Sequence, residues 1–385
     1  MKRRREEEVN KTNLSGSSSG SDTSSSESSE EAPALALDQH GRIAGAYGEI
    51  NYNFQCYNSI FQSESQWSKT SISALIEDCK VSFTAREVNE SADYSDGETF
   101  FVPANSLPTT NIERLVLDIF RCHTENMTYD PKRSGAEWWS LVVDAEDGGV
   151  GFHWDKDYGM EEHGVSIFPH LATVTYLGEV EAAPTLILQK VAPPMYHEDV
   201  SGPCGDKALL SWPEHGKHIV FDGRFLHAAV PEMIHLKNGA SKEASNTNKK
   251  RVSLLVNIWL NHLPRDAHPI AQSFKQKLSC EGLSLETSST SRKPLVNLAL
   301  ATDMSKYAMK VDPGKKNKIM RWDFTHSSEK YSITVPVPVI GASGGSGGSQ
   351  DTGPSEVVLG KKLRQATTLQ FEFDAPSVRP NVSKI

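Results

Sequence analysis

Cysteines are few in this chain and long apolar runs are missing, and both shortages narrow the kinds of protein it can be. The five cysteines are odd in number and include no C-x-x-C pair: Cys56, Cys79, Cys122, Cys204 and Cys280. Scattered single cysteines indicate reduced thiols in an intracellular protein, in the cytoplasm or the nucleus. No stretch reaches the ~18 apolar residues of a membrane span, and no apolar segment follows the first basic residues, which argues against a secretory signal.

A surplus of basic residues is missing as well. The formal net charge is −9, which argues against a non-specific nucleic-acid binder. The start of the chain has a basic run at Lys2–Arg5 and a Ser- and acid-rich stretch at Ser15–Glu31. Such a segment buries too little apolar surface to offset the entropy of ordering it, so we predict a disordered tail. A nuclear-import signal beside phosphorylatable serines is the sharper alternative.

The middle of the chain has the strongest secondary-structure signals. Helical spacing of apolar residues occurs at Ile72–Val81 and at Asn111–Cys122, and we expect both helices to pack outside a sheet. Short runs rich in β-branched and aromatic residues then predict eight strands: Trp138–Val143, Gly151–Trp154, Ala172–Leu177, Thr185–Gln189, Ala208–Ser211, His218–Phe221, Leu226–Val230 and Arg251–Trp259. Eight strands without helices between them favour a jelly-roll barrel, so the predicted fold is mainly β with flanking helices.

These patterns divide the chain into six segments: a disordered Ser/Glu-rich tail (1–44), a helical and mixed support region (45–135), a strand-rich core (136–263), a C-terminal extension that packs on the core (264–340), a Gly/Ser-rich flexible loop (341–356) and a C-terminal strand and tail (357–385). We expect a helix at Ala271–Leu278. Alternation predicts strands at Ser332–Val339 and Thr367–Phe373, which we expect to pair across the loop. Pro336 and Pro338 lack a backbone donor, which suits the first of these strands to a sheet edge.

His153-Trp154-Asp155 is the most informative motif. With 13 His and 49 Asp+Glu in the chain, about one or two H-x-[DE] matches are expected by chance, and three occur. His123-Thr124-Glu125 ends a helical pattern, and His197-Glu198-Asp199 lies in a loop-like stretch. Only His153 follows a predicted strand and a Gly-rich turn. A pair of metal ligands needs such a rigid support, so the sequence favours His153 and Asp155.

A second histidine, His227, completes a candidate metal site. It lies near the start of the predicted strand Leu226–Val230, just after the Asp222-Gly223 turn, where it can point into a barrel mouth. The alternative is a core histidine bonded to a backbone carbonyl. Two imidazoles and one carboxylate can bind one face of a ferrous ion and leave its other positions open for chemistry. Further along, Arg251 and Ser253 share one face of a strand. A guanidinium there could bind the carboxylate of a cosubstrate.

Together these residues resemble the iron- and 2-oxoglutarate-dependent dioxygenase superfamily. Gly151–Asp155, the Asp-Gly-x-x-x-His turn that ends at His227, and Arg251-x-Ser253 occur in the matching order, over about residues 136–263. Pro169–Leu177 resembles the strand that follows the H-x-D motif in the prolyl-4-hydroxylase-like branch. The resemblance implies a double-stranded β-helix core.

The resemblance also implies a chemistry. His153, Asp155 and His227 would be the catalytic ligands of Fe(II), and Arg251 with Ser253 would hold 2-oxoglutarate, the small-molecule cosubstrate. O2 would oxidise 2-oxoglutarate to succinate and CO2, coupled to hydroxylation or oxidative demethylation of a substrate. Ascorbate is an optional reductant, and a protein side chain such as proline is the default substrate. Neither a membrane nor a nucleic acid is expected as a partner.

Two departures from the family pattern concern the cosubstrate and the substrate. Arg251 lies 24 residues after His227, further than is usual, and we interpret the polar stretch Asn238–Lys250 as an inserted loop. Lys237, nearer to His227, is the competing binder of 2-oxoglutarate. In addition, Glu181–Pro184 replaces a Gly-Gly pair that relatives often carry, so the wall on the substrate side is expected to differ.

Neighbouring residues have weaker signals. Trp138 and Trp139 stand where relatives often carry a tyrosine near the cosubstrate, and we interpret both as core residues. Asp157 and Tyr158 follow the H-x-D motif and are candidates for support of the metal ligands. His163 and His170 could line an entrance, but surface or core positions are the simpler interpretation.

Two other functions stay open. A cupin-like metal enzyme that does not use 2-oxoglutarate would leave Arg251 without a role. A non-catalytic binding module on the same barrel would use its polar ends for partners, but the intact set of three metal ligands argues against it.

Overall fold

The computed structural model describes residues 35–61, 69–86, 97–144, 149–178, 182–236, 250–280, 296, 298, 301–315, 317–338, 366–374 and 376–385. Backbone contacts divide the chain into a unit at Met1–Leu35 and a unit at Ala36–Ile385, and the fold below is that of the second unit. The expected Gly/Ser-rich loop at 341–356 lies outside the described residues, as do Lys237 and nearly all of the expected insertion at 238–250.

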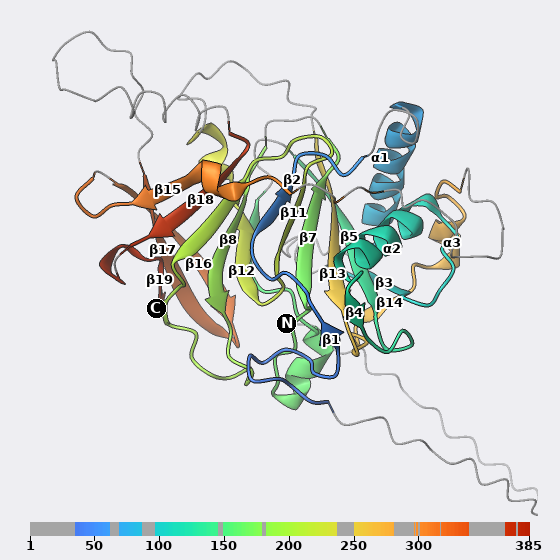
Figure 1. Ribbon diagram of the computed structural model, residues 1–385, viewed down its shortest axis with the longest axis horizontal. Coiled ribbons are helices and arrows are strands. Elements are labelled where there is room, and N and C mark those ends of the chain that lie inside the picture. The colour runs from blue at the N-terminus through green and yellow to red at the C-terminus, as the bar shows by residue number, and fades with distance from the viewer. Residues whose placement is uncertain are drawn as a thin grey trace, which may run out of the picture. The chain divides into compact units, whose positions relative to one another are not determined.

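Seven described strands form the larger of two facing sheets (Figure 1). Their hydrogen-bonded order is β14-β3-β5-β13-β7-β11-β2. Every pair is antiparallel except β14 with β3. The strands are β2 (Gln55–Tyr57), β3 (Thr99–Pro103), β5 (Gly135–Asp144), β7 (Leu171–Tyr176), β11 (His218–Asp222), β13 (Lys250–Trp259) and β14 (Ala267–His268).

The smaller sheet faces it, with six described strands in the order β15-β18-β10-β8-β12-β6. All its pairs are antiparallel except β15 with β18. The strands are β6 (Val150–His153), β8 (Thr185–Val191), β10 (Lys207–Ser211), β12 (Phe225–Ala229), β15 (Ala308–Val311) and β18 (Thr368–Phe373).

The chain follows a jelly-roll path between these sheets. From β5 it crosses at β6, β7 and β8, stays in the smaller sheet at β10, and crosses again at β11, β12 and β13. Each of the eight strands predicted from the sequence overlaps one of these core strands. The predicted fold class, mainly β with flanking helices and a double-stranded β-helix core, is therefore confirmed.

Strand β13 packs against the helices with one face and lines the space between the two sheets with the other. Successive side chains of a strand point to opposite faces. One face of β13 is aliphatic and packs beneath the helices: Val252, Leu254, Val256 and Ile258. The other face points into the barrel between the sheets and is mostly polar or aromatic: Arg251, Ser253, Leu255, Asn257 and Trp259. The interior of the barrel is thus apolar at its centre and polar toward both ends of this strand.

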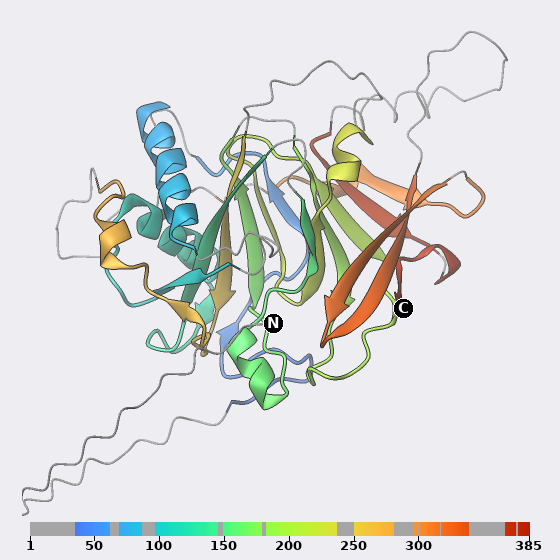
Figure 2. The same ribbon diagram turned by 180° about the vertical axis from the view of Figure 1, so that it is seen from behind.

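Two helices, α1 (Lys69–Thr84) and α2 (Asn111–His123), cover the outer face of the larger sheet (Figures 1 and 2). Both contain the helical segments predicted from the sequence. At the start of α2, Thr110 accepts a hydrogen bond from the backbone N–H of Glu113, and the Glu113 carboxylate accepts one from the backbone N–H of Thr109. The first bond satisfies a donor that the first helical turn leaves free, and the second ties the residue before the N-cap to the same turn.

The helix expected at Ala271–Leu278 is shorter than predicted, because α3 spans only Gln272–Lys275. Just beyond it, the backbone N–H of Ser279 donates to Asp78 of α1, so the chain leaves the helical path toward that neighbour. The remaining short elements are the 3₁₀ helices at Tyr158–His163, Pro231–Leu236, Met304–Tyr307 and Pro376–Val378, and the pair β1 (Tyr47–Gly48) and β4 (Met127–Thr128).

A third sheet packs on the outer face of the smaller sheet, in the order β16-β17-β19-β9. Its strands are β9 (Gly202–Pro203), β16 (Asn317–His326), β17 (Glu329–Pro338) and β19 (Asn381–Lys384). The expected pairing of the strands at 332–339 and 367–373 is wrong, because β17 pairs with β16 and β19 while β18 pairs with β10 and β15. A tight turn at Ser327-Ser328, both with positive φ, joins β16 to β17 at little cost in loop entropy.

The prolines of β17 lie where the strand has one partner. β19 pairs only with residues Tyr331 to Thr334 of β17, whereas β16 continues beside Pro336 and Pro338. The strand is therefore internal to its sheet at one end and forms an edge at its prolines, where a missing backbone donor is tolerated.

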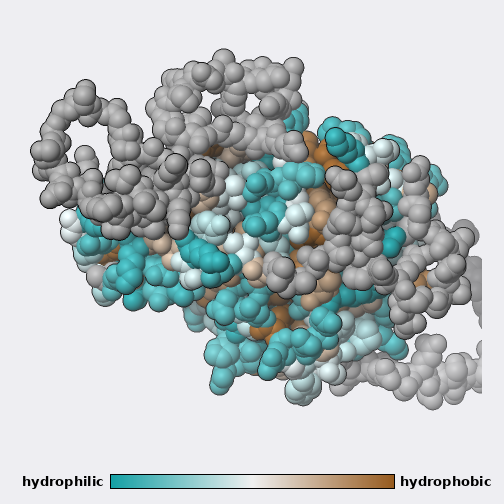
Figure 3. Space-filling model, turned by 45° about the horizontal axis from the view of Figure 1, so that its top comes forward, coloured by the Kyte–Doolittle hydropathy of each residue, from teal (hydrophilic) through white to brown (hydrophobic). Residues whose placement is uncertain are grey.

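The surface of the described residues is largely hydrophilic, with a few small hydrophobic areas on the face that Figure 3 shows. Isolated exposed apolar side chains of this kind, such as Tyr47 and Leu107, are ordinary for a folded protein. In the part of the chain that is described, no helix is long and apolar enough to cross a membrane.

The C-terminal strand β18 is expected to be essential for stability. Phe371 on β18 is fully buried in the cluster between the smaller sheet and the third sheet. Phe371→Ala should lower the free energy of unfolding by about 3–5 kcal/mol, because it removes buried apolar area and leaves a cavity. Ile319→Ala on β16, where the side chain is 63% exposed, is the control and should change it by less than about 0.5 kcal/mol. Equal midpoints for both variants in urea denaturation would contradict this.

Candidate metal centre

Strand pairing brings His153 and His227 together. β6 and β12 are antiparallel neighbours, and these two histidines are directly opposite in their register. The centroids of the two imidazole rings lie 4.3 Å apart. The register shifts between His227 and Ala229, an irregularity of the kind that re-aims side chains next to functional sites.

Each imidazole is oriented by the backbone of its own strand. Nδ1 of His153 lies 2.8 Å from the carbonyl oxygen of Gly151, and Nδ1 of His227 lies 2.9 Å from that of Phe225. A carbonyl oxygen only accepts, so each Nδ1 carries the hydrogen. In the neutral ring Nε2 then keeps its lone pair, which is the state that a metal ligand requires.

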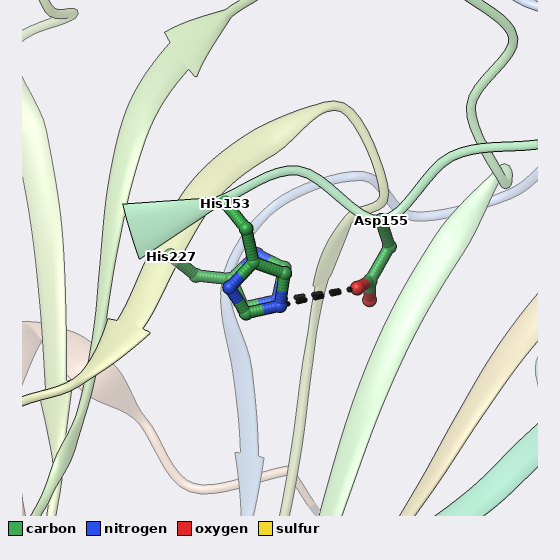
Figure 4. Close-up of side chains that lie close together, drawn as sticks. All are labelled: His153, Asp155 and His227. Carbon is green, nitrogen blue, oxygen red and sulfur yellow. Dashed lines mark ion pairs between the residues drawn. The ribbon is translucent and has the colours of Figure 1, made fainter. Parts of the chain in front are cut away.

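Both Nε2 atoms face one carboxylate, as Figure 4 shows. Oδ1 of Asp155 lies 3.5 Å from each of them. Among the described residues, His153, Asp155 and His227 form the one group of three His, Cys, Asp or Glu side chains whose ligand atoms all lie within 4.8 Å of one another. Atoms bound to one ion at about 2.1 Å lie roughly 3 Å apart on adjacent octahedral positions. The donor set and its spacing fit a divalent metal ion.

The electrostatics of the group favour a bound cation. Burial alone would raise the pKa of Asp155, but the two imidazoles outweigh it and hold that pKa below its ordinary value. Burial alone would lower the pKa of His227, but the Asp155 carboxylate outweighs it and raises that pKa. Nε2 of His227 is buried without a hydrogen-bond partner. A metal ion would satisfy this atom and neutralise the carboxylate.

Arg251 and Ser253 lie inside the same barrel. The Arg251 guanidinium donates to Ser253 Oγ (3.1 Å), to the carbonyl oxygen of Ala183 (2.8 Å) and to Thr185 Oγ1 (3.1 Å). All these acceptors are uncharged, and among the described residues no acidic side chain forms an ion pair with Arg251, which is 3% exposed. Burial lowers the pKa of this guanidinium from its ordinary value. A buried cation without a counter-ion is costly, so the position suits an anionic ligand.

Two residues near Arg251 were not anticipated from the sequence. The Tyr176 ring lies 5.4 Å from Cζ of Arg251, and its hydroxyl donates to Thr185 Oγ1 at 2.8 Å. Both belong to predicted strands, on the face that points into the barrel. Each lies two residues from an apolar interior residue of its own strand, Val174 or Ile187, so the alternation predicted that both side chains point into the barrel. The sequence did not indicate which strands would lie next to Arg251.

Among the described residues, the other H-x-[DE] matches do not belong to a group of three possible metal ligands. His123 follows the helical face of α2 and stacks on His218, with the two Nε2 atoms 3.1 Å apart. His197 is exposed, and its Nδ1 lies 2.9 Å from Ser327 Oγ. The context that favoured His153 therefore selected the one match that lies beside a second histidine and a carboxylate.

Three other candidates from the sequence, Trp138, Trp139 and Asp157, pack in the core or hold the chain near the metal group in place. Trp138 faces the helices and packs on Phe100, whereas Trp139 points into the barrel. Asp157 pairs with His262 at 2.7 Å, two residues after Asp155, and so anchors the chain that follows the H-x-D motif.

The remaining three candidates do not line the metal group through any described contact. The Tyr158 hydroxyl donates to the carbonyl oxygen of Trp154. His170 is buried beside the turn of β11 and β12, and burial lowers its pKa to about 4. His163 bonds to Arg265.

Comparison of the sequence with protein-family models gives no match, and comparison with curated proteins gives none either. Among solved structures, one that this chain resembles is EctD from S. alaskensis with 2-oxoglutarate and 5-hydroxyectoine, with 12% identity, a TM-score of 0.32, and 61% of this chain and 95% of that chain covered. Another is EvdO2 from Micromonospora carbonacea var. aurantiaca complexed with 2-oxoglutarate, with 12% identity, a TM-score of 0.29, and 59% and 92% covered.

A third is an oxidoreductase of the 2OG-Fe(II) oxygenase family from Burkholderia pseudomallei, with 13% identity, a TM-score of 0.18 and 36% of this chain covered; this chain spans 46% of that one. These overlaps are low. The strand order and the side chains, and not these likenesses, define what the site can do.

Replacement of His153 is expected to weaken metal binding strongly. Titration of the purified protein with Mn(II), followed by electron paramagnetic resonance, should show an affinity about 100-fold lower or worse for His153→Ala, because one of three ligands is lost. His197→Ala, in another H-x-E pair of the sequence, is the matched control and should bind as tightly as the unchanged protein. Equal affinity in both variants would exclude His153 as a ligand.

Proposed function

We propose that this protein is an Fe(II)- and 2-oxoglutarate-dependent dioxygenase that hydroxylates a C–H bond of its substrate. His153, Asp155 and His227 would hold the metal ion, and Arg251 with Ser253 would hold the far carboxylate of 2-oxoglutarate. Three protein ligands on one face leave positions open for the cosubstrate and for O2, the arrangement expected of a non-haem iron oxygenase.

The observation that carries the proposal is the buried guanidinium in the barrel that also holds the candidate metal ligands. Arg251 has only uncharged partners among the described residues, and its planar fork matches a carboxylate in two-point geometry. A dicarboxylate that chelates the metal at one end offers the missing counter-ion at the other. A cupin-like enzyme that ignores 2-oxoglutarate would leave this buried charge without a purpose, and so would a binding module without catalysis.

The residues of the barrel would orient the reactants and exclude water. Bound Fe(II) with 2-oxoglutarate supplies the activation of O2, with formation of succinate and CO2 as the substrate is hydroxylated. The Nδ1–H bonds of His153 and His227 to their own strands fix the direction of both Nε2 atoms. Phe221, whose ring centroid is 5.1 Å from that of His227, and the aliphatic interior keep water away from the reacting atoms.

From the resemblance noted in the sequence we propose that the substrate is a prolyl or other protein side chain, with ascorbate as an optional reductant. Both stay predictions.

Arg251→Ala tests the role of the guanidinium. Succinate formation from 2-oxoglutarate should need at least about 30-fold more cosubstrate for half-maximal rate, because removal of one partner of a buried charge pair costs 2–5 kcal/mol or more. The affinity for Mn(II) should stay unchanged. Lys250→Ala, at the exposed neighbouring position, is the control and should leave the KM for 2-oxoglutarate as it is. An unaltered KM in the Arg251 variant would contradict the proposed role.

A further inference from the structure

Two polar residues, Asn257 and Glu137, lie in the same row of paired residues across the larger sheet as Phe221, which contacts the metal group. Phe221 of β11, which contacts the His227 ring, is paired with Ala172 of β7, and Ala172 is paired with Asn257 of β13. Asn257 is in turn paired with Glu137 of β5. Directly paired residues share one face of a sheet, so all four side chains project into the barrel, and the small Ala172 separates the polar pair from Phe221.

Glu137 is a buried carboxyl group with donors but no cation around it. Oε1 accepts from the Thr99 hydroxyl at 2.8 Å, and Oε2 accepts from Trp259 Nε1 at 2.8 Å and from Asn257 Nδ2 at 3.2 Å. The side chain is more than nine-tenths buried, since Glu137 is 7% exposed. Within the described part of the chain no Lys, Arg or His forms an ion pair with it.

Asn257 leaves an acceptor unused. The residue is 2% exposed, and its Oδ1 is buried without a hydrogen-bond partner. A buried carbonyl oxygen without a hydrogen-bond partner is destabilising, so a ligand that donates to it would be favoured. One N–H of its amide donates to Glu137. The acceptors that the pair still offers are the free Oδ1 of Asn257 and the remaining lone pair of the Glu137 carboxylate.

The pair lies far along β13 from Arg251, the residue proposed to hold the cosubstrate. Arg251 is near the start of β13 and Asn257 is six residues further along, about 20 Å along the strand at roughly 3.3 Å per residue. A ligand that reaches from the metal to Arg251 therefore extends away from Asn257. Burial raises the pKa of Glu137 to about 7, with a further contribution from the charge of Asp155. A cation beside Glu137 would favour its ionised form.

From these positions we infer that Asn257 and Glu137 recognise a cationic nitrogen group of the substrate, a guanidinium or an ammonium, and hold it beside the metal group. The group would donate one hydrogen bond to Asn257 Oδ1 and pair with the Glu137 carboxylate. This inference rests on the proposed function for the meaning of "substrate", but the binding of a cation at Asn257 and Glu137 can be tested separately. It points to basic side chains or amines as the compounds to screen first.

The test uses the full-length protein loaded with Mn(II) and 2-oxoglutarate, and two probes of similar shape: n-butylguanidinium and the neutral n-butylurea. Mn(II) broadens the proton resonances of a probe that binds near it, and this effect falls steeply with distance. We expect saturable broadening of butylguanidinium and an affinity for butylurea lower by about tenfold or more, because only the cation pairs with the buried carboxylate. Equal broadening of the two probes would overturn the inference.

Three variants assign the effect to the pair. Glu137→Gln removes the charge and keeps the shape, and Asn257→Leu removes the free acceptor. Each should weaken butylguanidinium binding by about tenfold or more. Glu137→Gln should leave butylurea unaffected, because only the cation loses a charged partner, and loss of packing alone would weaken both probes. Asn257→Asp keeps an acceptor oxygen, and its protonated carboxyl can donate to Glu137 as the amide does, so this variant should retain more of the binding than Asn257→Leu. Unchanged butylguanidinium affinity in folded Glu137→Gln and Asn257→Leu would overturn the inference.

The two proposals fail differently in this experiment. Saturation transfer from the protein to each probe, recorded in parallel with Mg(II), reports binding without the paramagnetic ion. Selective butylguanidinium binding in a protein whose Mn(II) resonance does not respond to 2-oxoglutarate would contradict the proposed function and support cation binding at Asn257 and Glu137. A responsive Mn(II) centre without selectivity between the probes would contradict cation binding there and leave the proposed function standing.

Discussion

The pairing of β6 with β12 is the constraint on which the site depends. It sets His153 opposite His227, and each histidine is turned by a hydrogen bond to the carbonyl two residues earlier in its own strand. Asp155, just beyond the end of β6, then needs only a short extended step to face both Nε2 atoms. Because these bonds tie each imidazole to the backbone of a paired strand, the geometry is largely prepared before any metal arrives, which lowers the cost of binding it.

The chemical character of the barrel interior changes along β13. Arg251 and Ser253 form a cationic end, Leu255 lies in the apolar centre, and Asn257 belongs to an acceptor-rich end with Glu137. A strand with an aliphatic outer face can place such different groups in one line, since alternate residues are free to serve the chemistry while the others hold the helices. The proposed cosubstrate and the proposed cationic substrate would thus approach the metal group from opposite ends.

Much of this could be predicted from the sequence. The eight core strands, both long helices and the choice of His153 over two other H-x-[DE] matches followed from local patterns. Three features did not. β17 pairs with β16, and β18 pairs within the smaller sheet. Both pairings depend on which sheet edges lack a partner strand, and the hydrophobic periodicity of a single segment does not show that. Tyr176 and Glu137 carry signals that are indistinguishable from those of ordinary strand residues, because a partner such as Arg251 or Asn257 becomes its neighbour only after the barrel closes.

We propose that one site binds both Fe(II) and 2-oxoglutarate, and absorption spectroscopy without oxygen tests this claim most directly. Fe(II) is added to the purified protein, followed by 2-oxoglutarate, and the visible spectrum is recorded after each step. We predict a weak charge-transfer band that appears only when both are present, because the keto acid then chelates the bound iron. Iron that binds tightly without producing the band at saturating 2-oxoglutarate would contradict the claim and favour a metal enzyme that does not use this cosubstrate.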